Sequence, residues 1–429
     1  MPKYSAPKYT HDVFPDAQNW EENSEYWEFL EEAFRDLCRL YDYRRVQTPI
    51  FEQTELFTRA VGEGTDIVSK EMFTFEDKAG RSMTLRPEGT AGAIRAYIED
   101  GLYAQGGVQK YWYIGPNFRY ERGQKGRYRQ HMQCGLEAIG SQDPALDAEV
   151  IQLAMAFYRR IGIERLTLKI NSVGCQECRP KHREALLVFA KPFLEEMSAD
   201  NQRRFRENPL RMLDSKDERD QQLLANAPAL IDFLCDECRT HFEALKGCLD
   251  LLGIPYELDP KLVRGFDYYT KTAFEVQSPD LGAQSTLCGG GRYDGLVEEL
   301  GGQAAPAVGC GMGIERALIA LQSLGRPLPV CAGPTAFLVT LGDDARNAGF
   351  KLLFELREAG VSADMDFGGK SMKAQMRAAD KASARFALIF GENELATGVA
   401  QCKDLKSGTQ EEVAISSLAE HLKSAEGQA

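Results

Sequence analysis

Basic side chains are concentrated in one short segment, Arg119–Glu137 (RYERGQKGRYRQHMQCGLE). Its first eleven residues hold five Lys or Arg, although the whole chain has a formal net charge of −13. Arginine suits phosphate binding because its planar guanidinium can donate two parallel hydrogen bonds to one phosphate. A solvated basic loop on an acidic protein would explain the segment equally well. Other segments must therefore decide whether it binds an anion.

The elements around this segment predict a β-hairpin with a basic tip. Tyr111–Arg119 is rich in aromatic and apolar residues and predicts a strand, and Gln130–Ile139 predicts the returning strand. Between them, Arg122–Gly126 (RGQKG) has the composition of a turn-rich loop. The hairpin would hold its cations together at one end.

Three segments further along the chain combine glycine and arginine at close spacing, and the first two of them also contain tyrosine. They are LVRGFDYYT at 262–270, CGGGRYDGL at 288–296 and GCGMGIERA at 309–317. With the basic segment, they resemble the histidyl-tRNA synthetases, class II aminoacyl-tRNA synthetases of bacterial type. The basic segment resembles motif 2, Gly309–Ala317 resembles motif 3, and the other two resemble signatures peculiar to the histidine enzymes. Four motifs in the family's order are far more specific than any single one, and the resemblance covers nearly the whole chain.

The resemblance implies the fold class and the division into domains. We expect an α+β catalytic domain on an antiparallel sheet at 1–325, with a helical insertion at 174–250. Three prolines in ten residues at 325–334 indicate a linker, placed at 326–334. The strand and helix patterns of 335–429 predict a C-terminal α/β domain with a mixed sheet. In the family an anticodon-binding domain occupies this position.

Hydrophobic spacing locates several elements of the catalytic domain. Residues 22–42 predict an amphipathic helix, and Arg45–Phe51 predicts a strand after it. Two strands are predicted around the Lys78–Arg81 turn, and then a helix from Thr90 to Asp100 that Thr90 or a neighbour caps. The region before the turn resembles motif 1, the dimer-forming element, so the resemblance implies a homodimer.

The resemblance implies a two-step reaction with L-histidine, ATP as its Mg²⁺ complex, and tRNA(His). Histidine attacks the α-phosphorus of ATP to form histidyl-adenylate, and the histidyl group then passes to the 3′ end of the tRNA. Both steps concentrate negative charge on the α-phosphate. We therefore expect catalysis by positioned cations rather than by a covalent protein intermediate.

Roles carry over to residues at matching motif positions. The implied ATP-binding residues are Arg119 for the α-phosphate, Arg127 for the phosphate tail, and Arg316 for adenine and the γ-phosphate. Arg264 is implied to lie against both the α-phosphate and the histidine carboxylate, so Arg264 and Arg119 are the implied catalytic residues. The loop-tip residues Arg122, Gly123 and Gln124 match positions that approach the acceptor stem of the tRNA.

The resemblance also implies a pocket for histidine. A neutral imidazole needs an acceptor at one nitrogen and a partner at the other, and Glu137 and Tyr269 are proposed for these places. The implied partners of the α-ammonium are Glu88, Thr90 and Gln133. Tyr268 and Tyr293 would form walls of the pocket, and Gly289–Gly291 would permit close approach of the backbone to the ligand.

Four of the eleven cysteines form two CxxC pairs, Cys175 with Cys178 and Cys235 with Cys238. This spacing lets both thiolates of one turn bind the same tetrahedral zinc ion. The two pairs stand far apart in sequence and would have to meet through folding. Two unrelated turns would explain the pattern equally well, and some relatives carry further cysteines near residues 198–215, a region in which Ser198 and Ser215 stand here. A structural zinc site therefore remains one of two open alternatives.

No run of about 18 apolar residues is present, and the N-terminus lacks the apolar core of a signal peptide. We expect a cytoplasmic protein without a membrane partner. The acidic composition opposes indiscriminate nucleic-acid binding, so a tRNA would be held by local basic patches.

The main alternative function is a non-catalytic, histidine-binding regulatory paralogue of the histidine-biosynthesis phosphoribosyltransferase. That paralogue generally lacks the C-terminal domain and part of the arginine set. This chain has residues 335–429 and retains Arg119, Arg264 and Arg316. A regulatory domain that binds uncharged tRNA would be fused to other modules, and the sequence shows none.

Overall fold

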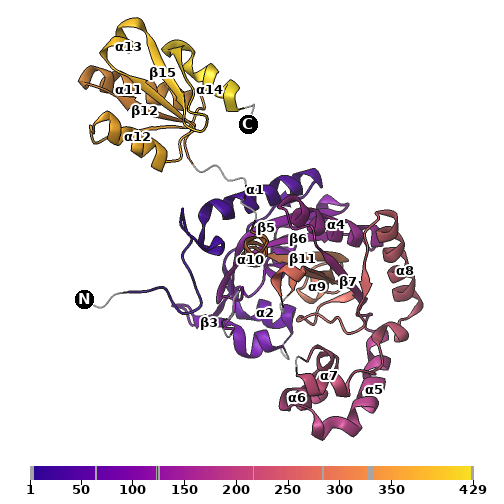
Figure 1. The fold of residues 1–429 in the computed structure, drawn as a ribbon. Helices are drawn as coiled ribbons and strands as arrows, with labels where there is room; N and C mark the ends of the chain where they lie inside the picture. The colour runs from indigo at the N-terminus through magenta and orange to yellow at the C-terminus, as the bar shows by residue number, and fades with distance from the viewer. Residues whose placement is uncertain are drawn as a thin grey trace. The chain divides into compact units, whose positions relative to one another are not determined.

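The computed structural model describes residues 4–62, 65–121, 123, 126–215, 217–282, 285–325, 328 and 333–426. The chain separates into two compact units, Met1–Leu328 and Pro329–Ala429. Figure 1 shows the smaller unit in orange to yellow and the larger one in the remaining colours.

Within the described residues, a sheet of eight strands forms the centre of the larger unit. The strand order is β1-β5-β6-β11-β10-β9-β7-β8, with parallel pairing only at the two edges. The strands are β1 (Arg44–Arg45), β5 (Gln109–Phe118), β6 (Gln130–Ile139), β7 (Thr167–Ser172), β8 (Glu257–Leu258), β9 (Thr270–Gln277), β10 (Thr286–Arg292) and β11 (Ala307–Gly313). The predicted hairpin is confirmed as β5 and β6, and the predicted catalytic fold on an antiparallel sheet is confirmed with it.

One face of this sheet is covered by helices (Figure 1). The helices that pack there are α1 (Ser24–Leu40), α4 (Pro144–Arg160), α8 (Asp236–Leu251) and α10 (Ile314–Leu324). Strand residues alternate between the two faces of a sheet. Cys134, Leu136 and Ala138 of β6 therefore enter this core, which turns the alternate residues Gln133 and Glu137 to the opposite face.

Smaller elements surround that opposite face. A second core there joins α2 (Thr54–Val61), α3 (Thr90–Glu99) and the short α9 (Leu296–Glu299). A three-stranded antiparallel sheet, in the order β2-β4-β3, lies beside them, with β2 (Phe51–Gln53), β3 (Phe73–Glu76) and β4 (Ser82–Leu85). The strands around the Lys78–Arg81 turn and the helix from Thr90 are confirmed.

The strand predicted over Arg45–Phe51 is wrong. The main-sheet strand ends at Arg45, and β2 begins only at Phe51, where it pairs with Leu85 of the small sheet. The segment between crosses from one sheet to the other and contains Pro49, which has no N–H to donate to a ladder. Extended, apolar sequence indicated a strand but could not reveal this change of partner.

The insertion is helical, as predicted, and part of it has its own core. Helices α5 (Cys178–Ala190), α6 (Ala199–Glu207) and α7 (Glu218–Leu223) form a lobe beside the sheet (Figure 1), with Leu186, Met212 and Leu224 buried within it. In contrast, α8 places Phe242, Leu245 and Leu249 in the main core. After this insertion, Leu262 lies outside any described strand, and its N–H closes a turn onto the Asp259 carbonyl.

The smaller unit is an α/β domain with a mixed sheet, as predicted. The order is β13-β12-β14-β15-β16, parallel among the first three strands and antiparallel among the last. Its elements are β12 (Ala336–Thr340), α11 (Asp343–Glu358), β13 (Ala363–Met365), α12 (Met372–Lys381), β14 (Phe386–Phe390), α13 (Glu392–Thr397), β15 (Val399–Asp404), β16 (Gln410–Ala414) and α14 (Leu418–Glu426). The short α13 was not predicted. Among the described helices of both units, none combines the length and apolar character needed to cross a bilayer.

Candidate active site

A row of glycines lies across the centre of the main sheet, on the face opposite the helices. Gly135 of β6 pairs with Gly311 of β11, which pairs with Gly289 of β10. A Cβ atom at any of these positions would collide with a side chain that lies flat on the sheet. In the same order, those side chains are Tyr113, Gln133 and Arg264. At position 289 a glycine is needed because it makes room for the guanidinium of Arg264.

The four predicted arginines meet at one cavity of about 450 Å³ on this face. They are Arg119, Arg127, Arg264 and Arg316, which come from the hairpin loop, the segment before β9 and helix α10. Gln133 and Thr286 also line the cavity. The cavity therefore brings together two arginines of the basic segment with two arginines from other parts of the chain.

Two of these guanidinium groups share one carboxylate. Arg119 Nη1 lies 3.9 Å from Glu121 Oε1, and Arg127 Nη1 lies 3.4 Å from Glu121 Oε2. Arg119 Nε also donates to the Pro87 carbonyl at 2.8 Å. The backbone contact fixes the plane of Arg119, while the long ion pairs leave donors of both arginines able to bind an anion.

Arg264 is held more tightly. Its Nη1 donates to Glu275 Oε1 at 2.6 Å, and its guanidinium carbon lies 5.8 Å from the centre of the Tyr269 ring. The second oxygen of Glu275 accepts from the Thr286 hydroxyl at 3.0 Å. Thr286 also links to Arg316, whose Nε donates to the Thr286 carbonyl at 2.6 Å. Arg264 and Arg316 are thereby fixed relative to each other.

Beside the arginine cavity lies a buried carboxyl group, Glu137. It accepts hydrogen bonds from the Thr90 hydroxyl at 2.8 Å, the Tyr113 hydroxyl at 3.0 Å, and the Tyr293 hydroxyl. Burial raises the pKa of Glu137 to about 8, although the hydroxyl donors act in the opposite direction. A carboxyl with this pKa can exchange its proton near neutral pH.

Glu88 caps helix α3. Its two oxygens accept from the backbone N–H groups of Thr90 at 2.6 Å and Ala91 at 2.8 Å. The expectation that Thr90 or a neighbour caps the helix is thus confirmed for a neighbour, Glu88, while the Thr90 hydroxyl is directed to Glu137. Burial raises the pKa of Glu88 as well.

Three tyrosines close this part of the site. The ring of Tyr293 meets the rings of Tyr268 and Tyr269 edge-on, with centroids 5.5 and 6.4 Å away. All three side chains are buried. Burial raises the pKa of Tyr269 to about 12, so its hydroxyl stays neutral and can donate a hydrogen bond.

Sequence reasoning missed several described residues of the site, among them Tyr113 and Glu275. Tyr113 pairs with Gly135 and faces Glu137, while Glu275 pairs with Gly289 and holds Arg264. The register of the β5–β6 hairpin could have placed Tyr113, because residues opposite each other share a face. Glu275 offers no such signal, since its partner Arg264 lies outside the strand ladder.

The three loop-tip residues are only partly covered by the structure. Arg122 and Gln124 lie outside the described residues. Gly123 packs against the ring of Tyr9 in the N-terminal segment, and a Cβ atom there would overlap that ring. The backbone of Tyr9 also accepts a hydrogen bond from the Arg129 N–H at 2.8 Å, which ties this segment to the base of the loop.

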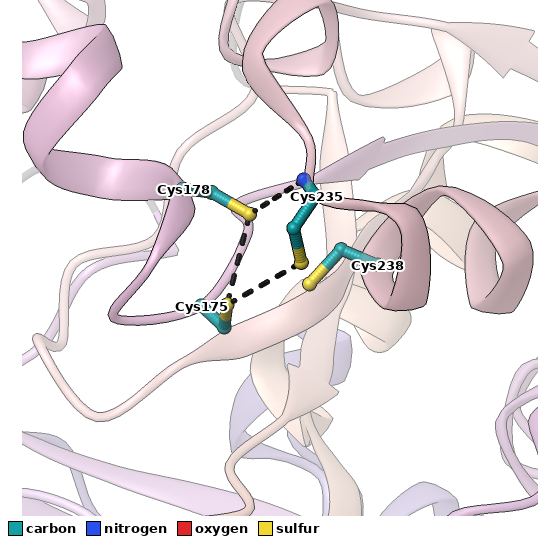
Figure 2. A group of neighbouring side chains, drawn as sticks. All are labelled: Cys175, Cys178, Cys235 and Cys238. Atoms are coloured by element: carbon teal, nitrogen blue, oxygen red, sulfur yellow. Dashed lines mark hydrogen bonds between the residues drawn. The ribbon is translucent and has the colours of Figure 1, made fainter.

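The four CxxC cysteines come together in space (Figure 2). Cys175 and Cys178 lie at the start of α5, Cys235 and Cys238 lie at the start of α8, and all four sulfur atoms are within 4.8 Å of one another. Cys175 Sγ is 3.6 Å from Cys178 Sγ and 3.8 Å from Cys235 Sγ. The two pairs are therefore one cluster and not two unrelated turns.

Comparisons with known proteins agree with this geometry. A family model described as "Histidyl-tRNA synthetase" matches residues 17–317, and one described as "Anticodon binding domain" matches residues 335–425. The chain is 51% identical over 416 residues to the histidine–tRNA ligase of Bacillus subtilis, with 96% of each chain covered. It is 49% identical over 417 residues to that of Desulforamulus reducens, covering 97% of this chain and 98% of the relative.

Solved structures show the same relationship. The apo histidyl-tRNA synthetase of S. aureus has a TM-score of 0.82 and 38% identity, over 98% of this chain and all of the other. The histidyl-tRNA synthetase of Nostoc sp. shares the fold at a TM-score of 0.69, with 22% identity over 99% of this chain and 100% of the other.

The antiparallel sheet with its arginine-lined cavity defines the catalytic domain of a class II aminoacyl-tRNA synthetase. The family model and the relatives identify one amino-acid specificity within this class, that for histidine. The chain belongs to the histidyl-tRNA synthetase family.

Proposed function

We propose that this protein is a histidine–tRNA ligase, which activates L-histidine with ATP and transfers it to the 3′ end of tRNA(His). One observation carries the proposal: four arginines surround a single cavity, and a buried carboxyl group with tyrosines lies directly beside it. The first feature suits the triphosphate of ATP, and the second suits an imidazole side chain.

In the first step, a carboxylate oxygen of histidine attacks the α-phosphorus of ATP, and pyrophosphate leaves. Arg264 would hold this carboxylate, and its contact with Glu275, which fixes the guanidinium at the edge of the cavity, supports this role. Arg119 would bind the α-phosphate, where charge develops in the transition state. Arg127 and Arg316 would hold the rest of the Mg²⁺–ATP complex, in which the ion belongs to the substrate.

Selection of histidine would come from Glu137 and Tyr269. A carboxyl oxygen of Glu137 would accept the N–H of one ring nitrogen, and the Tyr269 hydroxyl would donate to the other. A substrate without ring nitrogens would leave these buried groups unpaired, and such penalties give strong discrimination. Glu88, Thr90 and Gln133 are proposed for the α-ammonium, and Tyr268 and Tyr293 for the walls.

In the second step, a terminal hydroxyl of the tRNA attacks the carbonyl of histidyl-adenylate, and AMP leaves. The unit Pro329–Ala429 is proposed to bind the anticodon, in keeping with the match of residues 335–425 to an anticodon-binding domain. Arg122, Gly123 and Gln124 are proposed to approach the acceptor stem. We also propose that the enzyme is a cytoplasmic homodimer with the division 1–325, 326–334 and 335–429.

The cysteine cluster is proposed as a structural zinc site. Tetrahedral coordination with Zn–S bonds of about 2.3 Å places sulfur atoms about 3.8 Å apart, and two pairs in the cluster lie at 3.6 and 3.8 Å. The Cys235 N–H also donates to Cys178 Sγ at 3.1 Å, a contact that stabilises a thiolate. Four thiolates would close the coordination sphere, so the ion would have no place for a substrate.

Histidine-dependent exchange of labelled pyrophosphate into ATP tests the proposed function. Exchange with histidine and not with other amino acids, followed by charging of tRNA(His), is the expected result. The competing function is the regulatory paralogue, which the complete arginine set argues against. A folded protein that binds histidine without catalysing exchange would favour that paralogue and contradict the ligase.

A further inference from the structure

Two sets of contacts connect the cysteine cluster to residues predicted for the histidine pocket. The first starts at Arg179, the neighbour of Cys178 on α5. Its Nε donates to the Val173 carbonyl at 3.2 Å, and its Nη2 donates to the carbonyl of Tyr269. A side chain next to a cluster cysteine therefore holds the backbone of a tyrosine that faces the histidine pocket.

The second set of contacts starts at Glu237, which stands between the two cysteines of α8. Glu237 Oε1 lies 2.8 Å from Lys271 Nζ, which also lies 3.4 Å from Asp294 Oδ2. Lys271 is almost fully buried and follows Tyr269 by two residues, while Asp294 follows Tyr293 directly. Both CxxC turns are thus tied to residues next to the pocket tyrosines.

The backbone between these contacts is closely constrained. The Lys271 N–H donates to the Gly174 carbonyl at 2.8 Å, and the Val173 N–H donates to the Lys271 carbonyl at 2.7 Å. Gly174 has a φ of +60°, and a Cβ atom there would lie 2.7 Å from Cys178 Cβ. The first CxxC turn is therefore packed against the start of β9, the strand that directly follows Tyr269.

We propose that the four cysteines hold one Zn²⁺ ion that sets the position of Tyr269, with Arg179 as the positioning residue. The ion joins the N-terminal ends of α5 and α8, which are far apart in sequence. With these ends fixed, Arg179 and Lys271 hold the pocket side of β9 in one place. The inference rests on the proposed function only in taking Tyr269 as a contact of histidine.

Arg179→Leu is the deciding variant, because it keeps all four cysteines and an apolar side chain but removes the guanidinium and its two hydrogen bonds. We expect one Zn²⁺ per chain in both wild type and variant, measured by inductively coupled plasma mass spectrometry after purification without added metal. We expect the Kd for histidine, measured by calorimetry, to rise about 10-fold, which is the usual effect of removing a residue that holds a ligand-binding residue in place. In pyrophosphate exchange, KM for histidine should rise similarly, while KM for ATP stays within about twofold.

Two further variants separate positioning from general damage. Arg183 lies one turn along α5, is exposed, and lines the same cavity of about 650 Å³ as Arg179, so Arg183→Leu is the matched control and should change neither constant. Arg179→Lys keeps one donor for the Tyr269 carbonyl and should restore part of the affinity. A wild-type Kd for histidine in Arg179→Leu would overturn the positioning role.

Cys235→Ser tests the metal site itself. We expect it to lose the Zn²⁺ and to weaken histidine binding at least as much as Arg179→Leu does. Absence of metal in the wild type, or full retention in Cys235→Ser, would overturn the site. The calorimetric readout does not require catalysis. If the wild type binds histidine without exchange, the ligase function is contradicted, while weaker binding by Arg179→Leu still supports the inference.

Discussion

Gly289→Ala should disable the enzyme without unfolding it. The new Cβ would lie 2.5 Å from Arg264 Cζ and 2.6 Å from Nη1, and nearer still to Nη2. Ordinary contacts between such atoms are about 3.5 Å or longer, so the guanidinium would have to move by about 1 Å. The displaced atoms are the end of a flexible side chain, and the main chain at 289 need not change.

A misplacement of about 1 Å in a reacting group costs about 100-fold in rate, which corresponds to about 2.7 kcal/mol of transition-state stabilisation. We therefore expect kcat/KM for histidine-dependent pyrophosphate exchange to fall by about 100-fold, while Tm changes by no more than about 2 °C. Gly295→Ala is the matched control, because a Cβ there meets nothing within 4 Å. It should leave both values unchanged.

The cause can be tested in the background of Arg264→Ala, which on our mechanism abolishes adenylation and leaves the fold intact. That change removes the group with which the Cβ collides. Adding Gly289→Ala should then alter the Kd for histidine by less than about twofold, because the two effects are not independent. A folded Gly289→Ala enzyme with wild-type exchange would refute the placement of Arg264, and so would normal adenylation by Arg264→Ala.

Three other changes test separate parts of the structure. Arg316→Ala should raise KM for ATP about 10-fold or more through loss of charge-assisted hydrogen bonds, with KM for histidine unchanged; an equal rise in both would contradict the assignment to ATP. In the folded state Glu137 keeps its proton up to a pKa of about 8, whereas the unfolded chain releases this proton near pH 4.5. Between pH 4.5 and about pH 8 the folded state therefore binds more protons than the unfolded state, and the protein loses stability as the pH rises. Glu137→Gln should therefore gain Tm relative to wild type at pH 8.5 but not at pH 4, as scanning fluorimetry across pH can show, and a constant difference would disprove the raised pKa. Asp147→Ala leaves the fully buried Arg292 with Asp294 as its one acidic partner among the described residues, and should lower the free energy of unfolding by about 3 to 5 kcal/mol in urea titration; a loss below about 1 kcal/mol would show that Asp294 compensates.

Local sequence was enough to predict elements whose partners lie nearby in the chain. The β5–β6 hairpin is one example, because an aromatic strand, a turn-rich loop and a second strand follow one another directly. Helix α1 is another, since Trp27, Leu30, Phe34 and Leu37 all enter the core as their spacing predicts. The arginines and the two CxxC pairs were also found, because their residue types and motif positions are themselves the signal.

Features that depend on distant partners were not predictable in the same way. Glu275 holds Arg264 only because β9 lies beside β10, and Arg292 is buried only because α4 supplies Asp147. The segment after Arg45 reads as one strand but divides between two sheets. Similarly, the CxxC spacing could not show that the pairs meet, since 57 residues separate Cys178 from Cys235.

The position of β11 has a consequence for the biosynthesis of this protein. It is the last strand of the main sheet to leave the ribosome, yet it lies between β6 and β10. Until it is made, the sheet exists as two halves with open edges, one carrying Glu137 and the other carrying Tyr269 and Gly289. Unpaired edges promote aggregation. If Glu137 and Tyr269 bind histidine as proposed, we expect the nascent chain to bind no histidine until residues 307–313 have emerged.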